Sequence, residues 1–301
     1  MAMTRAAFAS YFIRGLKEVF LTAGKELPSV YDRVFNVMQS DKNYEEMLGM
    51  VGFGYLAAEG ELETIALQDA MEGFKTRFTH VKYGLGYQIS QELVDDDMYG
   101  QIKQFPQALA RSARATMEKV SADIFNLGFS GGAALADGEQ LFSTAHPLRR
   151  GGTASNKAAT AADLSFSALR QAAIDLRKIH DDSDMPVSGS ESLTLIVHPD
   201  DEFNAAEILK SVERPDTANR ATNALAKQRR WDLLVWDYLT DADAWFVQYP
   251  KDQHKLICFV RKAVSQDAEQ DIMIDAWKHV ARYRKSVGAA DFRGVWGNPG
   301  A

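Results

Sequence analysis

The feature that most constrains the fold is one long segment with helical spacing, residues 106–127. Pro106 suits the first turn of a helix, and Gly128 suits a left-handed residue just beyond its end. At about 1.5 Å per residue the helix would run roughly 30 Å, longer than an average globular helix. The segment therefore predicts a brace along an elongated molecule. Its apolar side chains recur every three or four residues, at Leu109, Ala113, Met117, Val120, Ile124 and Leu127.

A second segment, residues 81–89, alternates apolar and polar side chains with the period of a half-buried β-strand. It closes a glycine-dotted run that starts near Gly49, and its polar face carries two glycines, which indicates close approach of another backbone. A projecting two-stranded ribbon is marginal alone in water and needs a partner to lie on. We therefore predict contacts between subunits at Val81, Tyr83 and Tyr87.

The first 26 residues form an amphipathic pattern that predicts a helical arm. Glu18 and Glu26 interrupt it, and no hydrophobic core with a small-residue cleavage site follows, so we expect no secretory signal. An arm of this kind docks on another surface. The residues that we predict to contact a neighbour are Phe8, Phe12, Leu16 and Phe20.

The rest of the chain predicts a mixed α+β protein with mainly antiparallel strands. Helical spacing returns over 169–179, and a buried strand over 193–197 leads into a second helix that ends near Glu213. A small, polar, glycine-bearing loop separates these elements from the long helix. Further short strands are predicted at 233–236, 244–249, 255–260 and 272–274.

Bulk composition excludes several classes of protein. With 301 residues, 46% hydrophobic and 25% charged, the chain has globular composition, and no run reaches the roughly 18 apolar residues of a membrane span. The single cysteine, Cys258, lies in an apolar run and is predicted to be buried. Because one cysteine cannot form a disulfide framework, the chain is compatible with a reducing compartment. A net charge of -7 argues against a protein whose main task is to grip phosphate backbones.

Candidate chemistry is sparse. Residues 128–132 match the G-x-S-x-G string around Ser130, but they follow a helix rather than a strand, unlike a nucleophile elbow. Asp181, Asp182 and Asp184 lie close to His180, but they lack the glycine and glutamate of a calcium loop, and no metal-binding histidine or cysteine spacing occurs. An oligomeric enzyme or ligand-binding protein with a site near Ser130 remains an alternative.

The end of the chain is basic, unlike the rest. From Ala276 onward five basic residues face one acidic residue, which gives +4 there. Aromatic residues are interleaved, a pattern that could clamp nucleic acid, although packing on the protein's own core is the simpler interpretation. A nucleic-acid-binding protein is therefore the third hypothesis. The residues that we predict to face DNA are Arg282, Arg284 and Lys285.

The order of these segments resembles the major capsid proteins with the Hong Kong 97-type fold, and among them the Mu-like phage head subunits. Residues 87–93 precede the long helix, which resembles that family's spine helix. Residues 137–145 lead into a His146-Pro147 pair that looks like the family's. The likeness ends with 195–199 and 291–297, so it spans nearly the whole chain.

This resemblance implies an α+β Hong Kong 97-type capsid fold and a structural protein without enzymatic activity or cofactor. It implies a subunit that assembles with itself into pentamers and hexamers of a virion, made in the host cytoplasm, and that encloses DNA non-specifically without a membrane partner. Portal, scaffold or decoration proteins are further implied partners. Some relatives join neighbours through a Lys to Asn bond; we recognise no such pair and expect none. The implied parts are an N-terminal arm at 1–48, an extended loop at 49–90, a peripheral domain at 91–159 with the spine helix at about 106–127, an axial domain at 160–265 and returning strands at 266–301.

Overall fold

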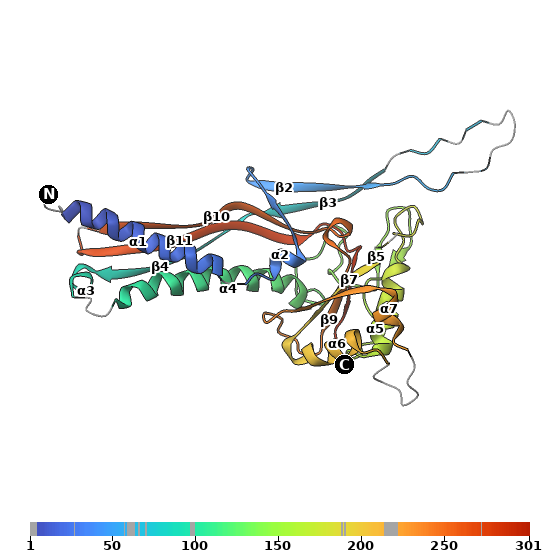
Figure 1. Ribbon diagram of the computed structural model, residues 1–301. Coiled ribbons are helices and arrows are strands. Elements are labelled where there is room, and N and C mark those ends of the chain that lie inside the picture. Colours follow the sequence, from blue (N-terminus) through green and yellow to red (C-terminus); the bar gives the residue numbers. More distant parts are fainter. Residues whose placement is uncertain are drawn as a thin grey trace.

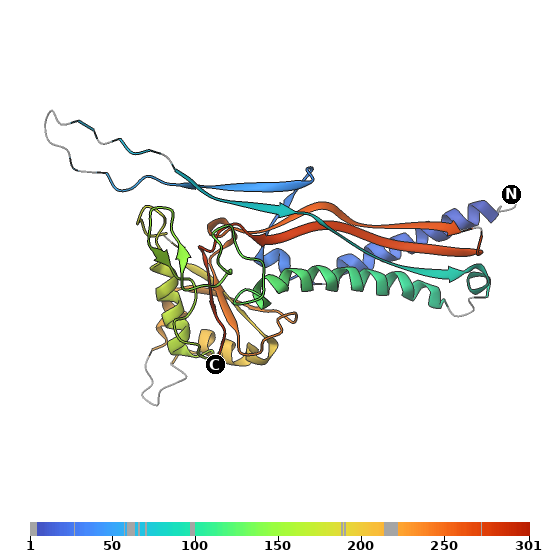
Figure 2. The same cartoon turned by 180° about the vertical axis from the view of Figure 1, so that it is seen from behind.

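The computed structural model describes residues 5–301 apart from 27, 57, 59–63, 66, 70, 97–99, 188, 190, 214–221 and 272. The molecule is elongated, with a long sheet and its helices at one end and a compact body at the other (Figure 1). A narrow hairpin extends past the compact body, away from the N-terminus, and the view from behind shows the same arrangement (Figure 2). The predicted α+β class is confirmed.

The long sheet has the strand order β1-β10-β11-β4. Strands β10 and β11 pair antiparallel along almost their full length, and β1 pairs parallel with β10. The predicted strand at 272–274 is wrong, because residues 273–275 form the turn between β10 and β11, with residue 272 outside the described part. The bounds are β1 (Asn36–Gln39), β4 (Val81–Ser90), β10 (Leu256–Asp271) and β11 (Ala276–Ala289).

Two helices pack beside this sheet. The long helix is confirmed as α4 (Gln104–Asn126), and α1 (Arg5–Glu26) lies against it. Gly128 does not take the left-handed conformation expected of it; Gly131 does, with φ 82°. A Cβ at Gly128 would lie 2.7 Å from the Phe142 ring, so close packing explains that glycine. Short helices flank them, α2 (Tyr31–Val34), α3 (Gln91–Asp95) and the 3-10 helix η1 (Gln101–Lys103).

The compact body is built on a second sheet of order β12-β9-β7-β8. Strands β9 and β12 are wholly buried, whereas β8 is partly exposed. Strand β7 pairs parallel with β8, but most strand pairs of the described residues are antiparallel, so the predicted mainly antiparallel arrangement is confirmed. The strands of the compact body are β7 (Ser192–Val197), β8 (Arg230–Val235), β9 (Trp245–Gln248) and β12 (Val295–Asn298), with the small pair β5 (His146–Pro147) and β6 (Thr153–Ala154). Its helices are α5 (Phe166–Arg177), η2 (Pro199–Asp201), α6 (Glu202–Lys210), α7 (Ala224–Gln228) and η3 (Lys251–Gln253).

The projecting hairpin consists of β2 (Tyr44–Val51) and β3 (Met71–Thr79). The strand predicted at 81–89 exists as β4, but it pairs with β11 in the long sheet and is not part of the ribbon. The backbone that approaches its glycines is that of β11, because a Cβ at Gly86 would lie 2.7 Å from the carbonyl oxygen of His279. The predicted boundaries at residues 49 and 265 accordingly fall inside β2 and β10.

Candidate functional site

The hairpin carries the two most exposed large apolar side chains of the described residues. Leu56 is 99% exposed and Leu67 is 96% exposed, so almost the whole of each side chain is in contact with water. Single exposed apolar residues are ordinary, but a contiguous set marks a surface that a partner covers. The other members of this apolar surface are Leu48, Met50, Phe53, Tyr55, Ile65 and Met71.

The predicted contact residues of the arm are buried within the chain instead. Leu16 packs with Ile89 and Ile102, and Phe20 packs with Leu109 of α4. Their apolar faces are thus covered by the subunit's own sheet and helix, and in this conformation they are not available to a neighbour. Phe8 and Phe12 lie outside the residues whose side chains are described.

The predicted contact residues of β4 have mixed surroundings. Val81 is 49% exposed, so a neighbour can reach it. The Tyr83 ring stacks on Tyr283, with 5.0 Å between ring centroids, and the Tyr87 ring stacks on His279 at 4.9 Å. The two tyrosines therefore brace the ladder between β4 and β11, and burial raises the pKa of both hydroxyls, that of Tyr87 to about 12.

Lys285, which the sequence predicted to face DNA, is buried inside the subunit. It is 1% exposed, and its ammonium donates to the Met117 carbonyl at 2.8 Å and to Ser121 Oγ at 3.1 Å, both on α4. Burial lowers its pKa to about 8. The sequence pattern did not reveal this, because a basic side chain at the end of a charged run looks solvated until the helix that covers it is known.

Arg282 and Arg284 are half-buried and already paired. Arg282 forms an ion pair with Asp267 at 2.6 Å. Arg284 donates to the His80 carbonyl at 3.4 Å and to Asn43 Oδ1 at 2.9 Å. Both side chains remain partly accessible, so their contact with DNA stays a prediction.

Glu118 on α4 anchors the segment that follows the arm, a role that the sequence did not indicate. The carboxylate is buried and accepts from the backbone N–H groups of Val30 and Tyr31 at 3.0 and 3.1 Å, and from Trp236 Nε1 at 3.1 Å. Arg114 lies 4.0 Å away. Because a buried carboxylate is costly without such partners, this one binds the start of α2 and the compact body to the long helix.

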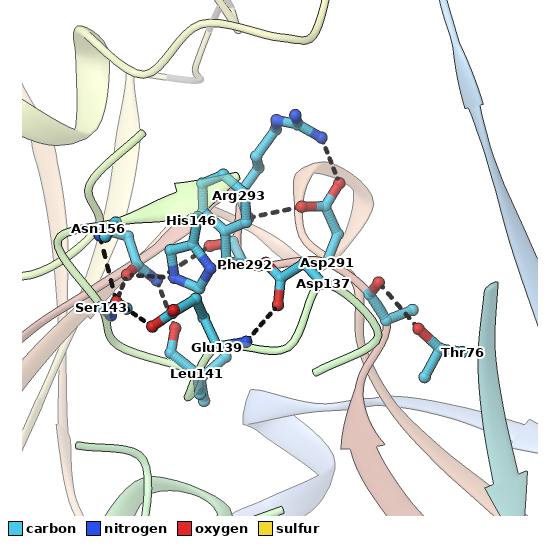
Figure 3. A network of polar contacts seen from close by, with 12 residues as sticks. Thr76, Asp137, Glu139, Leu141, Ser143, His146, Asn156, Asp291, Phe292 and Arg293 are labelled. Atoms are coloured by element: carbon cyan, nitrogen blue, oxygen red, sulfur yellow. Dashed lines mark hydrogen bonds and ion pairs between the residues drawn. The ribbon is translucent and has the colours of Figure 1, made fainter. Parts of the chain in front are cut away.

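A second buried network occupies the stretch that carries the His146-Pro147 motif (Figure 3). His146 is fully buried, with Nδ1 2.7 Å from Asp137 Oδ2 and Nε2 3.1 Å from Asn156 Oδ1. The Asn156 amide nitrogen donates to the Leu141 and Phe292 carbonyls, so its oxygen must face the ring. Both ring nitrogens thus lie within hydrogen-bond distance of an oxygen, and the ring is held in place from two sides.

The same network has the features of a structural tie rather than a catalytic centre. The His146 ring stacks on Phe292 with 3.9 Å between centroids, and this closes off its face. The Ser143 hydroxyl donates to Glu139 at 2.8 Å instead of to the histidine. Figure 3 shows these side chains converging from separate loops of the compact body, which they hold together.

The alternative sites gain no support from the geometry. Ser130 is exposed in the turn after α4 and is not the nucleophile of an elbow. In the acidic loop, Asp181 accepts from the backbone of Ser183 and Met185, and Asp182 pairs with Arg293 at 2.9 Å. Among the described residues, no group of three or more His, Cys, Asp or Glu side chains could hold a metal ion.

Comparison with known proteins decides the family. A model of the family described as phage capsid protein matches residues 72–298, which is more than half of the chain. The chain belongs to the phage capsid protein family. Its Hong Kong 97-type fold is confirmed by solved structures, and it is a major capsid subunit of a phage head. No helix in the described part of this capsid protein is long and apolar enough to cross a membrane.

Several solved structures share the fold at low sequence identity. The virus-like particle from Pyrococcus furiosus matches with a TM-score of 0.56 and 10% identity, over 95% of this chain and 98% of that one. The capsid of cyanophage P-SCSP1u gives 0.61 and 9%, over 91% and 88% of the two chains. The procapsid of bacteriophage JBD30 gives 0.54 and 16%, over 98% and 75%. A search of curated proteins found no match.

Proposed function

We propose that this capsid protein is the self-assembling subunit of a Mu-like phage or prophage head, which forms pentamers and hexamers of a closed icosahedral shell around DNA. It acts as a structural protein without catalysis or cofactor, and it is made in the cytoplasm of the bacterial host. The observation that carries the proposal is the apolar surface of the hairpin, which a lone subunit leaves in water. The solved structures described above that share its fold are a virus-like particle, a phage capsid and a procapsid.

Burial of this surface by sister subunits is the physical basis of assembly. At roughly 25 cal/mol per Å² of apolar area, covering a few leucine and aromatic side chains contributes several kcal/mol per contact. Each contact can be modest, because many simultaneous contacts in a closed shell raise the effective concentration. Heterologous contacts that close into rings suit both five-fold and six-fold environments. Val81, at the exposed edge of β4, is a further proposed contact.

Scaffold, portal and decoration proteins are proposed as additional partners, and packaged DNA is proposed to be held non-specifically. Arg282 and Arg284 are the proposed DNA-side residues; Lys285 is removed from that set because α4 covers it.

The test is to replace Leu56 and Leu67 together by Asp and to compare the product with the parent by negative-stain electron microscopy. We expect the parent to form shells, rings or tubes and the Asp variant to remain dispersed, because a charge cannot be buried in an apolar contact without a partner. Its thermal unfolding as a dispersed subunit should match that of dispersed parent, since both side chains are almost fully exposed.

The matched control is Leu56→Met with Leu67→Met, which keeps the surface apolar and should still assemble. Shells of normal appearance from the Asp variant would remove the hairpin from the contact. Parent protein that stays monomeric at high concentration would overturn the proposed self-assembly.

A further inference from the structure

The base of the hairpin has an irregularity at which it can bend. The pairing of β2 with β3 shifts register between Leu48 and Met50. At the same level the two backbones nearly touch, because a Cβ on Gly73 would lie 2.8 Å from the carbonyl carbon of Gly49. A bulge with a glycine pair leaves the ladder locally disrupted, so the ladder alone does not hold the outer part of the hairpin in one direction.

Three side chains of the compact body reach the hairpin at this point. Ser183 Oγ donates to the Gly52 carbonyl at 2.6 Å, and Arg150 donates to the same oxygen at 3.2 Å. Arg149 donates to the Gly73 carbonyl at 2.9 Å. Gly52 follows β2 directly and Gly73 lies in β3, so both strands of the hairpin are held.

The loops that carry these donors are themselves fixed. The Arg149 backbone N–H donates to Asp182 Oδ1 at 2.7 Å, while Asp182 Oδ2 pairs with Arg293 at 2.9 Å. The Arg149 guanidinium also lies over the Phe74 ring of β3, 4.2 Å from its centroid. The loop that carries Arg149 and Arg150 is thus bonded to the loop that carries Asp182 and Ser183, and the second loop is bonded to the connection between β11 and β12. These bonds hold the three donors in position.

We propose that Ser183, Arg149 and Arg150 form a clamp that sets the direction in which the hairpin projects, and that the hairpin swings at the Gly49–Gly73 bulge when the clamp is released. Ser183 is buried, but Arg149 and Arg150 are exposed, and single hydrogen bonds to backbone carbonyls contribute only about 1 kcal/mol each, so the clamp can be released. Its action is a property of the single subunit and goes beyond the proposed assembly. It determines where the apolar surface of the hairpin is presented.

The experiment measures a distance distribution by pulsed electron spin resonance in the full chain, kept dilute as dispersed subunits. Spin labels are attached at Leu56→Cys on the hairpin and Lys210→Cys at the end of α6; both positions are exposed, and the native Cys258 is buried and stays unlabelled. We expect a single narrow distribution in the labelled parent. Arg149→Ala combined with Arg150→Ala and Ser183→Ala should broaden it about twofold or shift it, because all three donors are lost.

The matched control is Arg170→Ala, which removes an exposed arginine on α5 and should leave the distribution narrow. If the triple variant fails to fold by circular dichroism, Arg150→Ala with Ser183→Ala removes both donors to Gly52 and keeps the Arg149 side chain on Gly73 and Phe74. The outer part of the hairpin then loses its only clamp contacts beyond the bulge, so the distribution should still broaden. A folded clamp variant with the parent's distribution, or a parent distribution that is already as broad, would overturn the proposal. Neither outcome tests shell assembly, which is tested separately by the variants of Leu56 and Leu67.

Discussion

Three buried polar side chains in this protein form hydrogen bonds with backbone groups or with other side chains. Glu118 accepts three hydrogen bonds, and Lys285 donates to a carbonyl and a hydroxyl on the same helix. His146 lies between two acceptors. Removing a hydrogen-bond partner of such a buried group lowers the free energy of unfolding by several kcal/mol. Substitutions at these residues are therefore expected to affect folding.

His254 makes the stability of the subunit depend on pH. It is 1% exposed, and its Nδ1 accepts from the Leu256 N–H at 3.2 Å. Burial, with the nearby Lys251 charge as a smaller cause, lowers its pKa from 6.5 to about 4. Between these two pH values His254 binds a proton in the unfolded chain but not in the folded chain. The contribution of His254 to the free energy of unfolding is therefore complete above about pH 6.5 and is lost as the pH drops toward 4.

We predict that His254→Asn, which keeps an acceptor for Leu256, flattens this dependence. The parent should lose about 3 kcal/mol more than the variant between pH 7 and pH 4, as measured by urea unfolding at each pH. His80 and His279 also have lowered pKa values and contribute equally to both proteins. Equal pH dependences of unfolding free energy for His254→Asn and the parent would refute the assignment.

At the scale of elements, the ladder between β4 and β11 joins distant parts of the chain. It pairs Val81 through Ser90 with Lys285 through Ala276. The two glycines of β4 differ in their surroundings. A Cβ at Gly86 would lie 2.7 Å from the His279 carbonyl oxygen and 2.9 Å from Val280 Cγ2, whereas one at Gly84 would meet only Arg282 Cγ at 3.4 Å and the Ala281 carbonyl oxygen at 3.6 Å.

Gly86→Ala should therefore destabilise the subunit by about 1 to 3 kcal/mol, because the backbone of β11 cannot yield without breaking the ladder. Gly84→Ala is the matched control in the same strand and should cost less than about 1 kcal/mol, since an Arg282 methylene can shift. Urea unfolding of the two variants beside the parent checks this. If both variants lost the same free energy of unfolding, close packing of β11 against Gly86 would not be the cause of the destabilisation.

The elements also show which sequence patterns were sufficient to predict a helix or a strand. The period of α4 and the alternation of β4 were predicted from the sequence, because both depend on which face of one segment is buried. The second half of β10, Ser265 to Asp271, was missed because it is polar and only half covered. Its strand conformation comes from pairing with β11, which no local pattern reveals.

For the whole molecule, the net charge bears on the proposed enclosure of DNA. A net charge of -7 repels DNA on average, so the proposed contacts with DNA are few and basic. Arg282 and Arg284 are proposed to make such contacts, although each is also bound to its own chain.

We predict that Arg282→Gln with Arg284→Gln weakens retention of double-stranded DNA by dispersed subunits. The slope of log affinity against log salt should fall by about two, because each phosphate contact releases about 0.9 counterion. Filter binding across a salt series measures this. Arg170→Gln with Lys178→Gln on the compact body removes the same charge and should not change the slope; an unchanged slope in the first variant would place the DNA elsewhere.

The candidate site was predicted only in outline. An apolar, glycine-bearing ribbon was expected, and one exists, but it consists of β2 and β3, with its most exposed leucines at 56 and 67. Leu16 and Phe20 have the apolar spacing of a docking face, yet they are buried in their own subunit. Spacing identifies a face that must be buried and does not say which chain buries it.

The sequence by itself determined the class of fold, the long helix and the alternating strand, because helical and strand periods are local consequences of burying one face. Only the tertiary structure decided which strands form the hairpin, that α4 covers Lys285, and that loops around Arg149 and Ser183 hold the hairpin base. These depend on contacts between residues far apart in the chain, and their geometry exists only when the backbone has been placed.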